Sequence, residues 1–364
     1  MADKRLKAWG NNRAGQLGDG SWAALHTKAT TVLGLAGSDV VRTAAGGAGA
    51  ATGHGLALLT DGSVRSWGAN GSGQLGDGSV SGRGAPDWVV NLGDATDIAA
   101  GGAHSLALCE DGTVLAWGRN AHGQLGNGGD ADSSVPVRVR RLDEVIAIAA
   151  GLHHSLALRA DGTVWAWGHN VNGQLGDGTS AGRNVPVQVA GLGAVSRIAA
   201  GANHSLAVSG GSAVKAWGFN ASGQLGDNTT INRYTPVHTR GGWSGGVSWI
   251  AAGSHHSLAV TGGDHRLRAW GQNTSGQLGD GSTTFRVTPV PVPGLAGVRQ
   301  VAGGREHTVV LLADGEVHSC GANASGQLGD GSTTDSSSPV RTFTDLVRAD
   351  TIAAAVGGDF SLAD

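Results

Sequence analysis

A module of roughly 50 residues recurs seven times along the 364-residue chain, and this repetition constrains the fold more than any other feature. Each copy carries a Trp-Gly pair, or its counterpart, followed six residues later by Gly-Gln-Leu-Gly. Most copies also carry an Ala-Gly-x-x-His-Ser-Leu-Ala segment. A period of this length is typical of propeller blades and exceeds that of ankyrin or leucine-rich units. The pairs begin at Trp9, Trp67, Trp117, Trp167, Trp217 and Trp270, and Cys320-Gly321 stands in the seventh place.

Within one repeat the pattern predicts four short β-strands. Asp-Gly pairs, a strong hairpin signal, separate the second strand from the third at 61, 111, 161 and 314. No segment has a helical period, and the 65 glycines of the chain disfavour helices. The sequence therefore predicts an all-β fold of four-stranded antiparallel blades. In the fourth repeat we expect strands over Val195–Ala200, His204–Ser209, Ala213–Trp217 and Pro236–Thr239.

The two ends of the chain predict how a ring of blades would close. From a repeat histidine to the following Trp-Gly pair is thirteen residues in most copies. Phe360 stands in the histidine place of the last copy, and four residues to the C-terminus plus nine from Met1 to Trp9 again make thirteen. The two ends therefore complete one blade together, which leaves no free sheet edge at the seam. This blade is expected to combine strands over Phe360–Ala363, Arg5–Ala8 and Lys28–Leu33.

We thus predict one domain over residues 1–364, a seven-bladed β-propeller whose last blade is shared between the N- and C-terminal segments. Internal repetition permits this length because each blade packs mainly on its neighbours. The blades are expected at residues 38–90, 95–140, 145–190, 194–240, 247–293, 297–342, and 346–364 together with 1–33.

Composition narrows the classes of partner. A formal net charge of −3 offers no electrostatic footprint for nucleic acid or for an anionic membrane. No apolar run approaches the roughly 18 residues that span a bilayer. Cys109 and Cys320 occupy different places in different repeats, so we expect no disulfide. We expect a monomeric cytoplasmic protein, or a secreted one if a signal peptide was removed, and rare lysine beside common arginine suggests a bacterial source.

The residues that recur in every repeat are interpreted as structural. A ring holds equivalent histidines far apart, whereas zinc needs three or four ligands converging at about 2.0–2.3 Å, so no metal site is predicted. We expect each imidazole to bond to the backbone near the start of a blade, and each tryptophan to fill the space between blades. The Gly-Gln-Leu-Gly-Asp-Gly corner lacks the Lys-Ser/Thr of a phosphate loop, and no cofactor is expected. The structural set comprises His104, His154, His204, His256, Trp67, Trp117, Trp167, Trp217 and Trp270, with His54 and His307 in looser copies.

The motif Trp-Gly-x-Asn-x-x-Gly-Gln-Leu-Gly, with a later Ala-Gly-x-x-His-Ser-Leu-Ala, resembles the repeat of the regulator of chromosome condensation family. The resemblance covers nearly the whole chain and implies a seven-bladed propeller. It also implies a choice of functions, because the family includes a nucleotide exchange factor for a small GTPase, accessory propellers of ubiquitin ligases, and bacterial inhibitors of β-lactamase. This chain lacks the exchange factor's basic tail and inserted hairpin, and it lacks aromatic residues at the loop positions that those inhibitors use.

Candidate binding residues emerge when the repeat is subtracted and only the variable positions are kept. Loops between first and second strands share one face of the ring with the corners between third and fourth strands, and we call this the upper face. Loops on a rigid scaffold usually carry binding chemistry. His153 and Glu306 are the predicted acid/base pair. The candidates, here called the upper-face sector, are His153, His169, Asn203, Phe219, His255, Gln272, Arg305 and Glu306.

Three functions remain open at this point. The first is a non-enzymatic interaction module that binds a protein partner through the upper face. The second is a biosynthetic enzyme of the cyclase or isomerase kind, which would bind a small molecule in a pocket at the propeller mouth. The third is a proteinaceous enzyme inhibitor. A partner surface would be broad and flat, whereas a catalyst needs a concave, mainly apolar cavity with a few converging polar groups.

Overall fold

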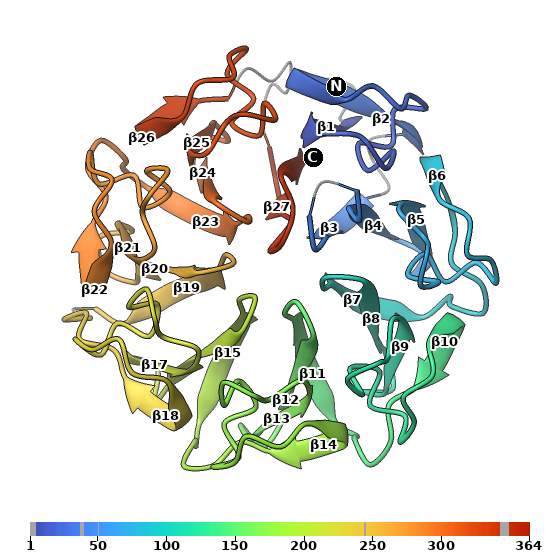
Figure 1. Ribbon diagram of the computed structural model, residues 1–364, viewed down its shortest axis with the longest axis horizontal. Coiled ribbons are helices and arrows are strands. Elements are labelled where there is room, and N and C mark those ends of the chain that lie inside the picture. The colour runs from blue at the N-terminus through green and yellow to red at the C-terminus, as the bar shows by residue number, and fades with distance from the viewer. Residues whose placement is uncertain (1–4, 37–39, 50, 244, 343–348) are drawn as a thin grey trace.

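A computed structural model describes residues 5–36, 40–49, 51–243, 245–342 and 349–364 of the chain. Seven four-stranded antiparallel sheets are arranged as blades around a central axis (Figure 1). The first strand of each blade lies nearest the axis and the fourth lies at the rim. Within these ranges every element is a β-strand, and no helix that could cross a membrane is present. The predicted seven-bladed propeller is confirmed.

Short loops and corners connect the strands. Blade 1 contains β3 (Val40–Gly46), β4 (His54–Leu59), β5 (Val64–Gly68) and β6 (Arg83–Trp88); blade 2 contains β7 (Ala95–Ala100), β8 (His104–Cys109), β9 (Val114–Gly118) and β10 (Ser133–Arg138); blade 3 contains β11 (Val145–Ala150), β12 (His154–Arg159), β13 (Val164–Gly168) and β14 (Arg183–Gln188). Blade 4 contains β15 (Val195–Ala200), β16 (His204–Ser209), β17 (Ala213–Gly218) and β18 (Arg233–His238); blade 5 contains β19 (Val247–Ala252), β20 (His256–Thr261), β21 (Leu267–Gly271) and β22 (Arg286–Pro291); blade 6 contains β23 (Val298–Gly303), β24 (His307–Leu312), β25 (Val317–Gly321) and β26 (Ser336–Arg341).

Blade 7 joins the two ends of the chain, as predicted. Its strands are β27 (Ile352–Ala354), β28 (Phe360–Ala363), β1 (Arg5–Asn11) and β2 (Leu25–Ala36). Strand β1 pairs antiparallel with β28, and their register places Lys7 opposite Ala363 and Gly10 opposite Phe360. Both N-terminal strands extend beyond their predicted limits. The predicted blade boundaries at 38 and 346, like Met1, lie outside the described residues.

The fourth strands depart most from prediction. In blade 4 this strand was expected over Pro236–Thr239, but β18 runs from Arg233 to His238. Strand β18 pairs with β17 in two parts separated by a register shift. On one side of the shift Ala216 pairs with Val237, and on the other side Gly218 pairs with Arg233. The pairing therefore resumes before Pro236, in a polar stretch that shows no strand pattern in the sequence.

The core lies between neighbouring blades. Trp167 of blade 3 is fully buried and packs in one apolar cluster with Leu106 and Leu125 of blade 2. Its indole Nε1 donates to the carbonyl oxygen of Gln124 at 2.8 Å. The same bond recurs at the other Trp-Gly positions, so each tryptophan joins its blade to the preceding one. In the seventh place Cys320 Sγ contacts Gln277 O at 3.6 Å.

The repeat histidines also join blades, but through side chains and not through the predicted bond to the backbone. His104 Nε2 lies 3.0 Å from Ser155 Oγ of the next blade, and Ser155 Oγ donates to Gln124 O at 3.0 Å. Since the hydroxyl proton is used on Gln124, the serine oxygen accepts from a protonated His104 Nε2. The partner was missed because it lies one blade ahead. Equivalent contacts join His54 to Ser105, His154 to Ser205, His204 to Ser257, His256 to Thr308, and His307 to Ser361.

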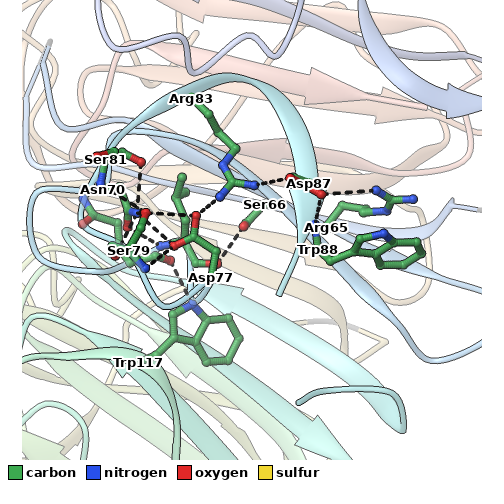
Figure 2. Close-up of polar contacts among 12 residues, drawn as sticks. Arg65, Ser66, Asn70, Asp77, Ser79, Ser81, Arg83, Asp87, Trp88 and Trp117 are labelled. Carbon is green, nitrogen blue, oxygen red and sulfur yellow. Dashed lines mark hydrogen bonds and ion pairs between the residues drawn. The ribbon is translucent and has the colours of Figure 1, made fainter. Parts of the chain in front are cut away.

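Side-chain hydrogen bonds shape the corner between the third and fourth strands. In blade 1, Asn70 Nδ2 donates to Asp77 Oδ1 at 3.3 Å and to the carbonyl oxygens of Ser79 and Ser81, each at 3.1 Å (Figure 2). Asp77 also forms an ion pair with Arg83. These contacts replace the backbone pairing that an irregular segment lacks. Equivalent ion pairs occur in three further blades, Asp177–Arg183, Asp227–Arg233 and Asp280–Arg286.

Candidate functional site

Backbone hydrogen bonds join the loops of consecutive blades around the propeller mouth. Leu152 N of blade 3 donates to Ala202 O of blade 4 at 3.2 Å, and Ala202 N donates to Ser254 O of blade 5 at 3.3 Å. Ser254 N then donates to Gly304 O of blade 6, and Arg305 N donates to Gly358 O of blade 7. The loops that present the variable residues are therefore fixed to one another as well as to their own strands.

A second set of backbone bonds brings the two kinds of variable position together within each blade. The amide of the residue after Trp-Gly donates to the carbonyl of the residue before the repeat histidine. The predicted candidates consequently form neighbouring pairs on the upper face. These bonds are His169 N to His153 O at 2.9 Å, Phe219 N to Asn203 O at 2.8 Å, Gln272 N to His255 O at 2.9 Å, and Ala322 N to Glu306 O at 2.8 Å.

Three imidazoles gather where blades 2 and 3 meet. The ring centroid of His122 lies 5.1 Å from that of His153 and 4.8 Å from that of His169. His153 and His169 are themselves 6.4 Å apart and edge-on. Arg119 is the residue after the Trp-Gly pair of blade 2, and its charge lowers the pKa of His122 and of His153. We call these four residues the histidine cluster.

Gln174 fixes the protonation of one imidazole in this cluster. Its Oε1 accepts a hydrogen bond from Asn172 N at 3.0 Å, so the amide must direct its NH₂ group elsewhere. Nε2 of Gln174 contacts His169 Nδ1 at 2.8 Å and Asn203 Oδ1 at 3.4 Å. His169 therefore accepts at Nδ1 and carries its proton on Nε2 when neutral. This leaves neither nitrogen of neutral His169 free to bind a metal.

Burial keeps the three imidazoles of the cluster neutral at physiological pH. Burial, followed by repulsion from His122, Arg119 and His169, lowers the pKa of His153 to about 4. Burial also lowers the pKa of His122 and of His169. Within the described ranges, no three His, Cys, Asp or Glu side chains are arranged to hold a metal ion. The cluster is thus three neutral imidazoles, each with one donor and one acceptor nitrogen, beside the cation of Arg119.

The sector continues into blades 4 and 5 with a mixed aromatic and polar surface. The Phe219 ring stands edge-on to His255, with centroids 5.8 Å apart. Gln272 Nε2 donates to Thr274 Oγ1 at 3.1 Å. Burial lowers the pKa of His255, while the carboxylate of Glu306 acts in the opposite direction. Unlike the histidine cluster, this part of the face contains its own carboxylate.

Arg305 and Glu306 end the sector at the junction of blades 6 and 7. The exposed Arg305 lies 3.6 Å from Asp359 in an ion pair, measured from Nε to Oδ1. Burial raises the pKa of Asp359, and Arg305 opposes that effect. Ser275 Oγ lies 3.5 Å from Glu306 Oε2. The two residues named as an acid/base pair lie in different surroundings: His153 lies against the imidazoles of His122 and His169, whereas the carboxylate of Glu306 lies near Ser275 and acts on His255.

The cavity on the ring axis does not involve the sector. It has a volume of about 220 Å³ and is lined by the first strands of the blades. Its lining consists of glycine and apolar residues, chiefly alanine, with Trp249 the largest. None of the eight predicted candidates is among its lining residues.

His122 and Arg119 belong to the site but were absent from the predicted set. His122 stands two residues before Gln124 in the corner, a position that is Ser or Asn in five other blades. The predicted set took its loop residues and its residues after Trp-Gly from the third to the sixth blades, so blade 2 was left out. Comparing all corner positions across repeats would have shown that blade 2 alone has both an arginine and a histidine there.

Solved structures of similar shape cover the whole chain. Human WBSCR16 superposes with a TM-score of 0.88 and 24% identity, covering 100% of this chain and 98% of that one. Prp20p of Saccharomyces cerevisiae, whose binding to Gsp1p and histones has been studied, superposes with a TM-score of 0.87 and 24% identity, covering 99% of this chain and 91% of that one. Yeast RCC1 (Prp20) bound to Kap60 superposes with a TM-score of 0.86 and 23% identity, covering 99% of this chain and 88% of that one. At these identities the likeness supports the fold alone.

Curated relatives match over short stretches. The ultraviolet-B receptor UVR8 of Arabidopsis thaliana is 39% identical over 67 residues, 18% of this chain and 15% of the receptor. The human E3 ubiquitin-protein ligase HERC2 is 44% identical over 62 residues, 16% of this chain and 1% of the ligase. The alignments thus span only a small part of either relative. The sequence model of the RCC1-like domain, by contrast, matches residues 5–363, and the chain accordingly belongs to the RCC1-like domain family.

Proposed function

We propose that this propeller is a non-enzymatic interaction module that binds a protein partner through the upper-face sector. The observation that carries the proposal is the pairing of variable positions, illustrated by the 2.9 Å bond from His169 N to His153 O. Repeat residues such as His154 and Trp167 are buried and hold the blades together. The residues that differ between blades are thereby displayed side by side on one rigid rim, as a recognition surface requires.

The comparisons support a protein as partner. Prp20p has been studied for binding to Gsp1p and histones, and yeast RCC1 has been crystallised with Kap60. Both share the fold of this chain, and neither identifies its partner here. The aromatic and arginine content of the sector, in Phe219 and Arg305, matches the residue types enriched at protein interfaces.

The shape of the mouth favours this function over a catalytic pocket. The axial cavity offers about 220 Å³ and an alanine-rich wall, below the roughly 300–1,000 Å³ of small-molecule sites. The polar candidates His153, His255 and Glu306 lie outside its lining. An enzyme would need polar groups that converge on a bound substrate.

Site-specific photo-cross-linking tests the face directly. A photoreactive phenylalanine analogue would replace Gln272 or Asn203 on the upper face, and Asp111 or Asp161 in the exposed Asp-Gly turns on the opposite face. After irradiation in cells of the source organism, mass spectrometry would identify cross-linked proteins. We expect one partner to be captured from both upper positions and from neither lower position.

A competition arm adds matched variants. Triple replacement of His255, Arg305 and Glu306 by alanine should abolish the cross-link from Asn203, while Asp111→Ala/Asp161→Ala should leave it intact. Both proteins must first show the wild-type melting curve. Capture from the lower positions only, or capture that survives the triple replacement, would show that the upper face is not the interface.

A further inference from the structure

An open groove adjoins the histidine cluster between the corners of blades 2 and 3. It has a volume of about 620 Å³, and its lining includes His122, His169, Val171, Val185, Val187 and Asp130. The corner of blade 2 is joined to β14 by two bonds, Gly128 N to Asn184 O at 2.9 Å and Asn184 Nδ2 to Gly128 O at 3.1 Å. Its walls are therefore held in place by the fold.

We propose that this groove binds an extended acidic segment of a protein partner, with a carboxylate bound by His169 and attracted by the charge of Arg119, and with an aliphatic side chain packed on Val171. The proposal rests on the proposed function for the source of the segment, and it adds the chemistry that would be recognised. Its basis is the charge and shape of the groove.

His122 and His169 line the groove, and His169 offers a hydrogen-bond donor there. His169 carries its proton on Nε2, because Gln174 occupies Nδ1 at 2.8 Å. Arg119 adds a permanent positive charge, and its planar guanidinium suits a carboxylate. In the described part of the chain no carboxylate forms an ion pair with Arg119 or with the three imidazoles. A carboxylate of a partner protein could therefore pair with these groups.

Charges elsewhere on the upper face already have internal partners. Arg305 forms an ion pair with Asp359 at 3.6 Å, and the carboxylate of Glu306 acts on His255. The single acidic side chain that lines the groove is the exposed Asp130. It is not among the groups that shift the pKa of His122 or His169. Arg119 is thus the charge that acts on His122, while Arg183, which also lines the groove, is ion-paired with Asp177.

The floor of the groove is apolar where the other blades have small or polar residues. Val171 is 62% exposed, and its counterparts in blades 1, 2 and 4 are Gly71, Ala121 and Ala221. Val185 and Val187 on β14 continue the same surface and are half-buried. An exposed valine next to further apolar surface gains free energy when a ligand covers it. This favours an aliphatic residue near the acidic one in the segment.

The test uses the full chain and a fluorescein-labelled hexapeptide, Glu-Glu-Leu-Glu-Glu-Leu, in a fluorescence anisotropy titration. Two comparison probes are the peptide with lysine in place of glutamate and an oligothymidylate of similar length. We expect saturable binding of the acidic peptide alone. Arg119→Gln, His169→Phe and Val171→Asp should each weaken binding about tenfold. Arg13→Ala, which removes an exposed arginine from the corner of blade 7, should leave affinity within about twofold.

Nitrogen-15 spectra of the histidine rings locate the peptide independently of any substitution. The His169 ring signals should move on titration, while those of the buried His104 should not. Binding without movement at His169, equal loss in Arg13→Ala, preference for the oligothymidylate, or no binding of the acidic peptide would each overturn the proposal. These results leave the cross-linking outcome unaffected, so failure of the groove and failure of the partner face can be told apart.

Discussion

His104 Nε2 lies 3.0 Å from Ser155 Oγ, although 51 residues separate them in sequence, and this contact joins blade 2 to blade 3. The Ser155 hydroxyl in turn donates to Gln124 O of blade 2, and the same carbonyl oxygen accepts from Trp167 Nε1 at 2.8 Å. One carbonyl thus receives two side chains of the next blade. Each junction of this kind gives the histidine Nε2 and the serine hydroxyl a partner across the blades, while the buried Nδ1 of the histidine has none.

Ser155→Ala should destabilise the fold by about 1–3 kcal/mol, because it leaves the buried His104 N–H without an acceptor. Gln124 O keeps its bond from Trp167, so the loss is confined to the histidine side. Urea unfolding followed by tryptophan fluorescence measures the effect. Ser180→Ala, at an exposed corner position, should change stability by less than about 0.5 kcal/mol. Equal midpoints for the two variants would contradict the role of the hydroxyl.

The junction between blades 7 and 1 is built differently. Phe360 replaces the histidine, and Gly55 stands where the next blade would offer a hydroxyl. The Phe360 ring is fully buried in a cluster with Ala45, Ala57 and Trp67. A side chain at Gly55 would clash with the Trp67 indole, since a Cβ there would lie 2.4 Å from the ring. The hydrogen-bonded link is thus replaced by apolar packing on both sides of the seam.

Phe360→His should therefore destabilise the protein although it restores the repeat consensus. The imidazole would be buried with no hydroxyl to accept its proton and would lose apolar contacts, which together cost about 2–4 kcal/mol. Phe360→Leu keeps the contacts apolar and should cost about 1 kcal/mol. Thermal unfolding compares them. A His variant that melts above the Leu variant would mean that the seam holds an unrecognised acceptor.

Seven blades, their inner three strands and the shared last blade were predictable because each rests on a local signal. The Asp-Gly turn at 161, for example, marks the hairpin of β12 and β13. The fourth strands were not, because β18 pairs through a register irregularity and its start depends on the Asp227–Arg233 contact.

The candidate site was predicted in part for a related reason. Pairing of His153 with His169 follows from the repeat, since the backbone bond between them recurs in every blade. Contact of His122 with both depends on how blade 2 sits against blade 3, which no single repeat records. The pairing of His104 with Ser155 could not be predicted for the same reason, because it joins a residue of one repeat to a residue of the next.

Asn170→Asp tests the corner network with an isosteric change. Asn170 Nδ2 donates to Asp177 Oδ1 at 3.2 Å and to Thr179 O and Ala181 O at 3.1 and 3.0 Å. A carboxylate would meet these acceptors with its own negative charge, so we expect a loss of about 2–4 kcal/mol at pH 8. Asn91→Asp in an exposed turn is the control and should be neutral. Unfolding free energies that agree would mean that the amide donors are dispensable.

The two cysteines should be unreactive in the native protein. Burial raises the pKa of the Cys320 thiol to about 12 and that of Cys109 to about 11. Since the thiolate is the reacting species, a thiol reagent such as Ellman's should label neither residue at pH 8. Both should react once denaturant unfolds the chain. Rapid labelling of the folded protein at either position would show that burial does not protect it.

Acid should unfold the ring through its histidines. Burial lowers the pKa of His104, His154, His256 and His307 to about 3 and that of His54 to about 4. The pKa of each of these histidines is lower in the folded state than in the unfolded state, where it is near 6.5. The folded protein therefore has its full stability above about pH 6.5 and loses stability as the pH falls toward the folded pKa values. At pH 5 each neutral imidazole costs about 2 kcal/mol relative to the protonated unfolded chain. Several together match the roughly 5–15 kcal/mol of a typical folded domain, so we expect unfolding between about pH 6 and 4.

His154→Gln separates this mechanism from protonation of carboxylates. Glutamine can still donate to Ser205 Oγ but does not titrate, so the variant should lose stability at pH 8 and lose less of it on acidification. The slope of the unfolding free energy against pH reports the number of protons taken up on unfolding, and between pH 6 and 5 this number should be smaller by about one in the variant. Carboxylates whose pKa is lowered, such as Asp177 and Asp227, also favour unfolding in acid, but they do so near and below their unfolded value of 3.8 and not between pH 6 and 5. Asp97 and Asp359, whose pKa burial raises, act in the opposite direction. An unchanged slope would show that His154 is not among the groups that drive acid unfolding.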